Sequence, residues 1–362
     1  MIFQTIFVYL LLTIVLFFTA RASDYKNKIS YILIGTFFYA LIFGLRLGVG
    51  VDFWAYQEWY ESLALWGDGY INFEPGFTAL AYVCLYFHLP FSVFLGIIAF
   101  LQLALIFLAI RPYNGSYRML SLTFMLGCIW LSYSNGMRQE LAFCIFAYSI
   151  QFIDRKSLLY YVTCIIIASL FHTSAIILLV IYPICHFKSE WFHRIFVQLI
   201  LLLTSLWLAT LSVVDNLIEY VDDFAINLGY GVYFEKEGYE FTDDISIGLG
   251  FFINLFLNIF LILSSSSVKK YFKSHWVNII YDLYFVGVLL RYILWGSQLF
   301  SRINYYFLGF EFIFSSFVLH YFYKNKRMVE FLLLILFYLL IFVATLYRMQ
   351  DNTALFLFNW QQ

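Results

Sequence analysis

Residues 91–110 read FSVFLGIIAFLQLALIFLAI, a run that contains no charged side chain. A helix of about 20 apolar residues crosses the roughly 30 Å of a bilayer's hydrocarbon core, so this run predicts a membrane-spanning helix. Seven further runs predict full spans of the same kind: 1–20, 30–47, 193–213, 246–263, 277–296, 303–322 and 328–347. The sequence therefore predicts an all-α, polytopic integral membrane protein.

The composition of the whole chain supports this class. Among 362 residues, 63% are hydrophobic and only 12% are charged. The formal net charge of -1 provides no general attraction for nucleic acid, so we expect no nucleic-acid partner. No internal repeat, low-complexity tract or linker interrupts the chain, and residues 1–362 are expected to form one transmembrane domain.

Some apolar segments are shorter than a full span. Residues 118–133 and 138–153 still predict spans. Residues 75–88, 157–170 and 173–185 form only about 20 Å of helix each, which is typical of half-helices or broken spans. Together the segments predict about 11–13 transmembrane helices, including the broken ones.

The lysines and arginines of short loops predict the orientation in the membrane. The positive-inside rule places the basic loops in the cytoplasm: 21–28, 155–156, 188–194, 269–273 and 324–327. Two acidic loops, near 48–74 and 214–245, are then expected on the outer side.

This alternation requires that 75–88 dips into the membrane and returns, and that 157–185 crosses twice with a turn at Phe171-His172-Thr173. A competing count treats 75–88 as a full span and 157–185 as one long helix, which places Arg111, Arg118, Arg155 and Lys156 outside. We favour the first count because it keeps every basic loop on one side.

Four arginines lie inside or at the end of apolar segments: Arg46, Arg138, Arg291 and Arg302. Each such charge costs about 3 kcal/mol or more in hydrocarbon unless a partner or cavity compensates it. The first count places three of them at the outer leaflet and Arg291 not far below. This grouping predicts an anion site there, although an ion pair between Arg291 and Glu311 that only locks two helices is the alternative for those two residues.

Short motifs surround these arginines. After Arg46, Gly48 and Gly50 lead to Asp52 and Tyr56, which share a face if that stretch is helical. An arginine that reaches the interface, followed by a helix-capping aspartate, is the simpler interpretation.

Glu74 precedes Pro75 at the start of the first half-helix, whose positive N-terminus suits an anion, though Glu74 is equally a plain helix-start acid. Arg138 lies in the first turn of its span, where a cation needs a compensating anion or carboxylate, and Glu140 points elsewhere on that helix. His172 lies between two apolar runs, so it is either a hydrogen-bonded structural residue or a catalytic one at a helix break.

These pieces resemble the Wzy/EpsG group of polysaccharide polymerases. The resemblance rests on five motifs in order: Arg46…Gly50-Val51-Asp52…Tyr56, Glu74-Pro75-Gly76-Phe77, Met137-Arg138-Gln139, Ser169 to Ala175, and Ser301-Arg302-Ile303…Tyr305-Tyr306. It implies a GT-C-like glycosyltransferase of the bacterial inner (cytoplasmic) membrane. The implied reaction joins undecaprenyl-diphosphate-linked oligosaccharide repeat units at the periplasmic face, in synthesis of O-antigen lipopolysaccharide or another surface polysaccharide. Expected partners are the lipid-linked oligosaccharide, membrane lipids and a chain-length regulator.

The residues fit that chemistry. A leaving diphosphate needs charge stabilisation, which arginine supplies through two parallel hydrogen bonds. We predict that Arg138 and Arg302 hold the donor diphosphate and that Arg46 or Arg291 holds the acceptor lipid. No cluster is spaced for a metal, so we expect a metal-independent reaction without a cofactor.

The acceptor hydroxyl must also lose a proton as it attacks. His172, Asp52 and Glu74 are the candidate bases. Further predicted substrate contacts are Tyr56, Gln139, Tyr305 and Tyr233.

The acidic, aromatic loop 215–244 is either a lid that holds glycan or a solvated interfacial loop. A flippase or transporter of lipid-linked sugars stays an alternative function, although it would usually show internal repeats and charges on both sides. An O-antigen ligase would share the chemistry with a different acceptor, and a membrane acyltransferase would share the histidine.

Overall fold

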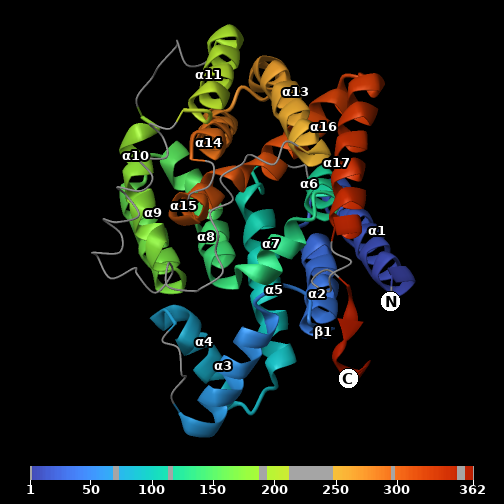
Figure 1. Ribbon diagram of the computed structural model, residues 1–362, viewed down its shortest axis with the longest axis vertical. Helices are drawn as coiled ribbons and strands as arrows, with labels where there is room; N and C mark the ends of the chain where they lie inside the picture. Colours follow the sequence, from blue (N-terminus) through green and yellow to red (C-terminus); the bar gives the residue numbers. More distant parts are fainter. Residues whose placement is uncertain are drawn as a thin grey trace. The chain divides into compact units, whose positions relative to one another are not determined.

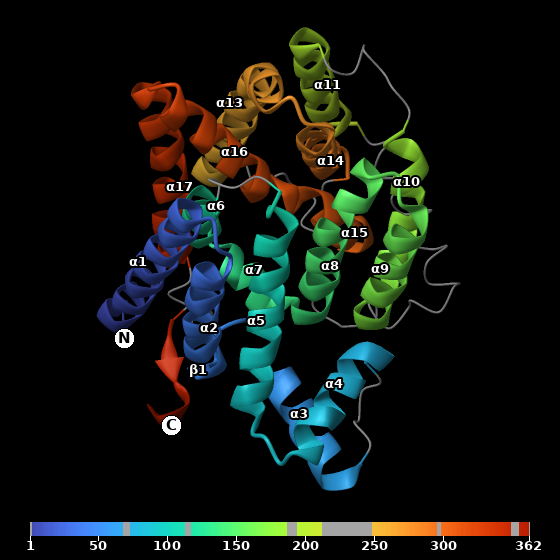
Figure 2. The same cartoon turned by 180° about the vertical axis from the view of Figure 1, so that it is seen from behind.

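The computed structural model describes residues 2–67, 73–112, 117–186, 194–211, 248–294, 298–348 and 355–361 (Figure 1, Figure 2). Nearly all of these residues are helical. The helices and strands divide the chain into two compact units, unit 1 comprising Met1–Phe187 with Ser315–Gln362 and unit 2 comprising Lys188–Phe314. The prediction of a single domain stays a prediction.

Unit 1 holds the N-terminal helices, the C-terminal helices and one short pair of strands. Its elements are α1 (Ile2–Lys26), α2 (Ser30–Gly44), β1 (Arg46–Leu47), α3 (Phe53–Trp66), α4 (Pro75–Tyr86), α5 (Phe91–Ala109), α6 (Tyr117–Leu126), α7 (Ile129–Asn135), α8 (Met137–Asp154), α9 (Leu158–Phe171), η1 (Thr173–Val180), α10 (Ile181–Ile184), α17 (Met328–Arg348), β2 (Leu357–Phe358) and η5 (Asn359–Gln361). Unit 2 holds α11 (Ile195–Leu208), α13 (Leu249–Phe272), α14 (His275–Ile293) and α15 (Gln298–Leu308). Helix α16 (Phe310–Lys324) begins in unit 2 and ends in unit 1.

Five described helices are long and apolar enough to cross a membrane: α1, α5, α13, α14 and most of α17. Shorter apolar helices accompany them, among them α2, α4, α9 and α11. Such helices satisfy their own backbone hydrogen bonds, which a bilayer requires. The prediction of an all-α, polytopic membrane protein is confirmed.

The sequence motifs of unit 1 lie together at one end of its helices. A Cβ on Gly44 would lie 2.6 Å from the Ser92 carbonyl oxygen, so the end of α2 touches the start of α5. The Val51 backbone N–H donates to the Asn135 side chain over 2.7 Å, which brings the start of α8 to the same level. We call this the motif end; it contains residues 44–52, 73–76, 135–138 and 171–173.

The opposite end of unit 1 carries basic side chains, among them Arg118, Arg155, Lys324 and Arg327, and we call it the basic end. The Asp24 carboxylate accepts the backbone N–H groups of Tyr117 at 3.2 Å and Arg118 at 3.3 Å, so α1 ends where α6 begins. The Arg118 guanidinium also lies 4.7 Å from the centre of the Tyr323 ring, near the end of α16. Arg46 and Arg118 therefore lie at opposite ends of unit 1, and the side of the membrane that each end faces stays a prediction.

Residues 157–185 form a helical hairpin. The Tyr161 hydroxyl of α9 donates to the Leu178 carbonyl of η1 over 2.5 Å. The chain reverses at His172, whose backbone is extended with φ -155° and ψ 114°. The predicted turn at Phe171-His172-Thr173 is confirmed, and the alternative of one long helix is wrong.

Helix α4 lies at the motif end and does not run along the bundle. A Cβ on Gly76 would lie 2.8 Å from the Leu170 carbonyl oxygen, so the start of α4 rests on the end of α9. The turn after α4 leads directly into α5, and in both views α3 and α4 lie beside the start of α5 (Figure 1, Figure 2). The expectation that 75–88 is not a full span is confirmed.

Three sequence-based boundaries need correction. The predicted span 118–133 is two helices, because Gly127 and Cys128 interrupt it: the Cys128 φ is 55°, and a Cβ on Gly127 would lie 2.9 Å from the Tyr338 ring. The predicted span 303–322 is likewise divided at Gly309 into α15 and α16. The predicted outer loop near 48–74 contains helix α3, an aromatic-rich segment that packs its buried rings against α4 and α5.

Unit 2 is held together by close packing and buried polar bonds. The Asn304 side chain donates to the Gly287 carbonyl over 3.0 Å, which joins α15 to α14. The Tyr284 hydroxyl donates to Asn258 over 2.7 Å, which joins α14 to α13. These bonds satisfy polar groups inside apolar helices, as a membrane interior demands.

Candidate functional site

One carboxylate, Glu74, connects the motif end. Its Oε1 lies 2.8 Å from Nδ1 of His172 and accepts the Thr173 backbone N–H over 3.3 Å. Its Oε2 accepts a hydrogen bond from Nη1 of Arg138 and forms an ion pair with it. The Glu74 side chain is only 11% exposed, so a single half-buried carboxylate joins α8 to the turn between α9 and η1.

The local sequence explains how Glu74 reaches this place. Pro75 begins α4, where its missing N–H costs no hydrogen bond. Gly76 has no Cβ, so α4 can approach the Leu170 carbonyl at the end of α9. Glu74 thereby meets both the histidine and the first backbone N–H of η1, which suits a carboxylate.

These partners set the charge of Glu74. Burial raises the pKa of the carboxyl, but the hydrogen bond with His172 and the charge of Arg138 outweigh burial, so the pKa falls to about 2. Glu74 is therefore an ionised carboxylate at neutral pH.

Arg138 lies in the first turn of α8, as predicted, and Glu74 is the carboxylate that compensates it. The guanidinium also stacks on the Phe73 ring, 4.1 Å from its centre, and interacts with the Tyr56 hydroxyl. Glu140 points elsewhere, as expected, because its carboxylate accepts a hydrogen bond from Ser132. An arginine has five N–H donors, and Nε of Arg138 is buried without a hydrogen-bond partner.

The ring of His172 is oriented by Glu74. The carboxylate occupies Nδ1 and favours the tautomer with a proton there. The other nitrogen, Nε2, can then accept a proton from a ligand. His172 lies at the reversal between α9 and η1 with its side chain 14% exposed, and the neighbouring carboxylate holds its ring in position.

Arg46 is a second cation of the motif end. It is 3% exposed; Nη1 donates to the Phe43 carbonyl over 2.8 Å and Nη2 lies 3.4 Å from the Met137 sulfur. Its Nε has no partner, and among the described residues no carboxylate forms an ion pair with Arg46. A buried cation without a counter-ion suits an anionic ligand.

The remaining predicted residues of unit 1 surround these two cations. Tyr56 is buried one helical turn after Asp52, and α3 confirms that the two share a helical face. Asp52 itself is exposed and does not cap α3 with its side chain. Gln139 is half-buried beside Arg138.

Other predicted residues belong to unit 2 or lie outside the described residues. Arg291, Arg302 and Tyr305 belong to unit 2, where Arg291 is half-buried and the other two are exposed. The charge of Arg291 acts on Glu311, but no ion pair joins these two described side chains. Tyr233 and the acidic loop 214–245 lie outside the described residues.

Some contacts of the site were not predicted. Phe73, Met137 and the Thr173 N–H each touch a charged group of the cluster. Phe73 precedes Glu74 in the chain, so an aromatic residue next to the motif was the one sequence feature that could have indicated its contact with Arg138. Within the ranges that the structure describes, no three metal-ligating side chains gather at one point; metal independence stays a prediction.

A family model described as the EpsG family matches residues 28–360, which is most of the chain. No curated protein and no solved structure shows a match. The matched range includes every residue of the cluster described above.

Proposed function

This chain belongs to the EpsG family, and from that premise we propose that it joins lipid-linked oligosaccharide repeat units into a longer glycan. Membership of this family supports a general assignment as a multi-pass membrane protein and polysaccharide polymerase. The proposed donor is the growing glycan on undecaprenyl diphosphate. The bond between the anomeric carbon and the diphosphate oxygen breaks, a bond to an acceptor sugar hydroxyl forms, and the lipid diphosphate leaves.

The observation that carries this proposal is the connection of Arg138, Glu74 and His172. It places a cation and a candidate base within reach of one carboxylate, in segments far apart in the chain. Glycosyl transfer from a diphosphate needs both groups, one for the leaving charge and one for the proton.

Among the three candidate bases, the geometry favours His172. Both oxygens of Glu74 are occupied by Arg138, His172 and the Thr173 N–H, so Glu74 acts as a positioning residue. The acceptor hydroxyl passes its proton to Nε2 of His172 as it attacks the anomeric carbon. Asp52, exposed at the start of α3, is better placed to contact sugar hydroxyls.

Arg46 and Arg138 are the proposed diphosphate ligands of unit 1. Arg46 has no carboxylate partner among the described side chains, and the Met137 sulfur that it contacts belongs to the residue before Arg138. Arg302 and Arg291 remain proposed ligands from unit 2. No metal or cofactor is included in the proposal.

The proposed orientation places the site at the periplasmic face of the bacterial inner membrane. The motif end lies opposite the basic end of unit 1, and basic ends of membrane helices usually face the cytoplasm. The growing glycan would then be assembled outside the cytoplasm, as part of surface polysaccharide synthesis. A chain-length regulator is a proposed partner.

The test supplies purified protein with lipid-linked repeat units and follows the glycan ladder. Arg138→Lys keeps a charge beside Glu74 but loses the planar fork, and His172→Gln removes the base. We expect each to lower the rate about 100-fold or more. Arg327→Ala, an exposed arginine of the basic end, is the matched control and should retain the full rate.

A ladder of normal rate in both site variants would contradict the assignment. The same assay separates the alternatives, because a ligase needs another acceptor and a flippase makes no ladder. Wild-type protein that makes no ladder from lipid-linked units alone would overturn the polymerase proposal itself.

A further inference from the structure

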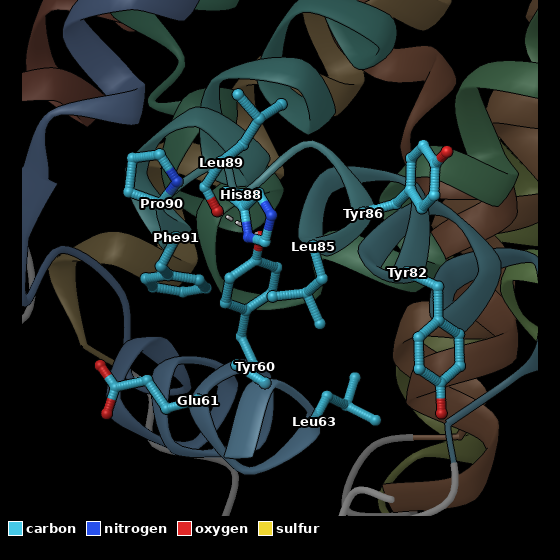
Figure 3. Close-up of a pocket in the computed structure, with 11 residues that line it drawn as sticks. Tyr60, Glu61, Leu63, Tyr82, Leu85, Tyr86, His88, Leu89, Pro90 and Phe91 are labelled. Atoms are coloured by element: carbon cyan, nitrogen blue, oxygen red, sulfur yellow. Dashed lines mark hydrogen bonds between the residues drawn. The ribbon is translucent and has the colours of Figure 1, made fainter. Parts of the chain in front are cut away.

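A hollow lies at the far end of α4 from Glu74. It has a volume of about 830 Å³ and lies between α3, α4 and the turn that leads into α5 (Figure 3). This volume is within the range of small-molecule sites in proteins. None of its lining residues belongs to the cluster of Glu74, Arg138 and His172.

Aromatic rings form much of its wall. Tyr82 and Tyr86 project from α4, and Phe91 stands across from them (Figure 3). The Tyr86 side chain is 79% exposed and Tyr82 is 42% exposed, so ring faces are free to receive a ligand. The Tyr82 hydroxyl donates to the Gly67 carbonyl over 2.6 Å, which fixes that ring in place.

Two polar side chains line the same hollow. Glu61 is exposed on α3, and its carboxylate accepts one hydrogen bond from Gln57 over 2.8 Å. His88 follows the end of α4 with φ 53° and is also exposed. The Tyr60 hydroxyl donates to the Leu89 carbonyl over 2.8 Å, so α3 and the turn that carries His88 are held together.

We propose that this pocket binds sugar units of the lipid-linked glycan at a distance from the reacting carbon. Aromatic faces stack on the C–H surfaces of sugars, while carboxylate and imidazole groups bond their hydroxyls. An isoprenyl chain would suit the rings, but it would remove water from Glu61 and His88 without replacing their hydrogen bonds.

This inference rests on the proposed function. The pocket residues of α4, from Tyr82 to Tyr86, follow Glu74 by eight to twelve residues, which is about 12–18 Å of helix. An oligosaccharide that reacts beside His172 can extend along α4 to reach the pocket. The pocket would therefore hold the glycan in register while its end reacts.

The test measures binding of a soluble probe to the full-length protein in detergent. The probe is the oligosaccharide of one repeat unit, released from the surface polysaccharide of the cell that carries this chain. We expect saturable binding that Tyr86→Ala and Glu61→Gln each weaken about fivefold or more. Val83→Ala is the matched control, because Val83 is 54% exposed on α4 but does not line the pocket.

A second probe, undecaprenyl monophosphate without sugar, identifies the occupant. We expect it not to compete with the oligosaccharide. Equal affinity in Tyr86→Ala, Glu61→Gln and wild type would overturn the inference, as would displacement of the sugar by the lipid.

The outcome is separable from that of the polymerase proposal. A wild-type ladder together with unchanged sugar binding in the pocket variants would contradict this inference alone. Tyr86-dependent sugar binding by a protein that forms no ladder would contradict the polymerase and support the pocket. Arg138→Lys is expected to lose the ladder and keep the binding.

Discussion

Glu74 shows how one residue can assign the roles of its neighbours. The two carboxylate oxygens of Glu74 contact Arg138, His172 and the Thr173 backbone N–H. The sequence motif allowed Glu74 to be either a base or an acid at a helix start, and these contacts show that it orients its neighbours. An ion pair of low exposure depends on both partners, because removal of one leaves the other charge buried.

Replacement of this carboxylate should destabilise the protein by the same amount at every pH from 5 to 7. The pKa of Glu74 is lowered to about 2, so its stabilising effect is complete above the unfolded value of about 4 and is lost as the pH falls toward about 2. We expect Glu74→Gln to unfold at a lower temperature than wild type, on the order of 3 kcal/mol less stable, at pH 7 and equally at pH 5.

Thermal unfolding of both proteins in detergent between pH 5 and pH 7 checks this expectation. Glu61→Gln, an exposed carboxylate of α3, serves as the control and should cost about 0.5 kcal/mol or less. A difference between Glu74→Gln and wild type that disappears already at pH 5 would contradict the lowered pKa.

At the scale of elements, the site depends on how closely two helices approach. Helix α4 is too short to cross a bilayer, and its start rests on the end of α9 through Gly76. This contact places Glu74 beside His172, so the distance between the two side chains depends on the separation of the two helices. The reversal between α9 and η1 then turns the histidine toward the carboxylate.

Gly76→Ala should disrupt the site without changing any charged residue. Its Cβ would lie 2.8 Å from the Leu170 carbonyl oxygen, a backbone atom that cannot rotate away. We expect α4 to shift and the rate of ladder formation to fall at least tenfold. The free energy of unfolding should fall by about 1–3 kcal/mol.

Gly250→Ala in α13 is the matched control, because nothing lies within 4 Å of its added Cβ. It should keep the activity and add up to about 1 kcal/mol of helix stability. Full activity in Gly76→Ala would show that the distance between α4 and α9 is unimportant.

At the scale of the whole molecule, the two termini of unit 1 support Arg46. Strand β2 near the C-terminus pairs with β1, where Arg46 is opposite Phe358. Phe356 is fully buried, and its backbone N–H donates to Thr5 of α1 over 2.9 Å. Its ring also contacts Phe43, the residue whose carbonyl accepts a hydrogen bond from Arg46.

Phe356→Ala should therefore act on stability and on the site together. We expect a loss of about 3–5 kcal/mol, which is usual for a buried phenylalanine, and a weaker ladder because Arg46 loses its support. Trp360→Ala, with a side chain 64% exposed, should cost about 1 kcal/mol or less. Similar unfolding temperatures for the two variants would contradict this role of the C-terminal segment.

Single cysteines in a background without the five native ones test the orientation of unit 1. Val51→Cys, at an exposed position of the motif end, should react with a membrane-impermeant maleimide in intact spheroplasts. Arg155→Cys and Lys324→Cys, exposed at the basic end, should react only after permeabilisation. The reverse pattern would place the site in the cytoplasm.

Much of the fold followed from sequence because the bilayer limits the choices. Long apolar runs must be helices there, and runs such as 91–110 matched the structure closely. Arginines near the helix ends, together with five short motifs, were enough to indicate the family. Helix breaks at Gly127 and Gly309 were missed, because both lie inside apolar runs. At Gly127 the missing Cβ leaves room for the Tyr338 ring, which hydrophobicity alone does not report.

Hydropathy and the short motifs predicted the class of protein, the hairpin turn at His172 and the residue types of the site. Helix packing pairs Glu74 with both Arg138 and His172, and it buries Arg46 without a carboxylate partner among the described residues. The physical reason is that hydropathy acts along the chain, through each segment's contact with lipid. Charge pairing acts across space, between helices whose distances no local pattern contains.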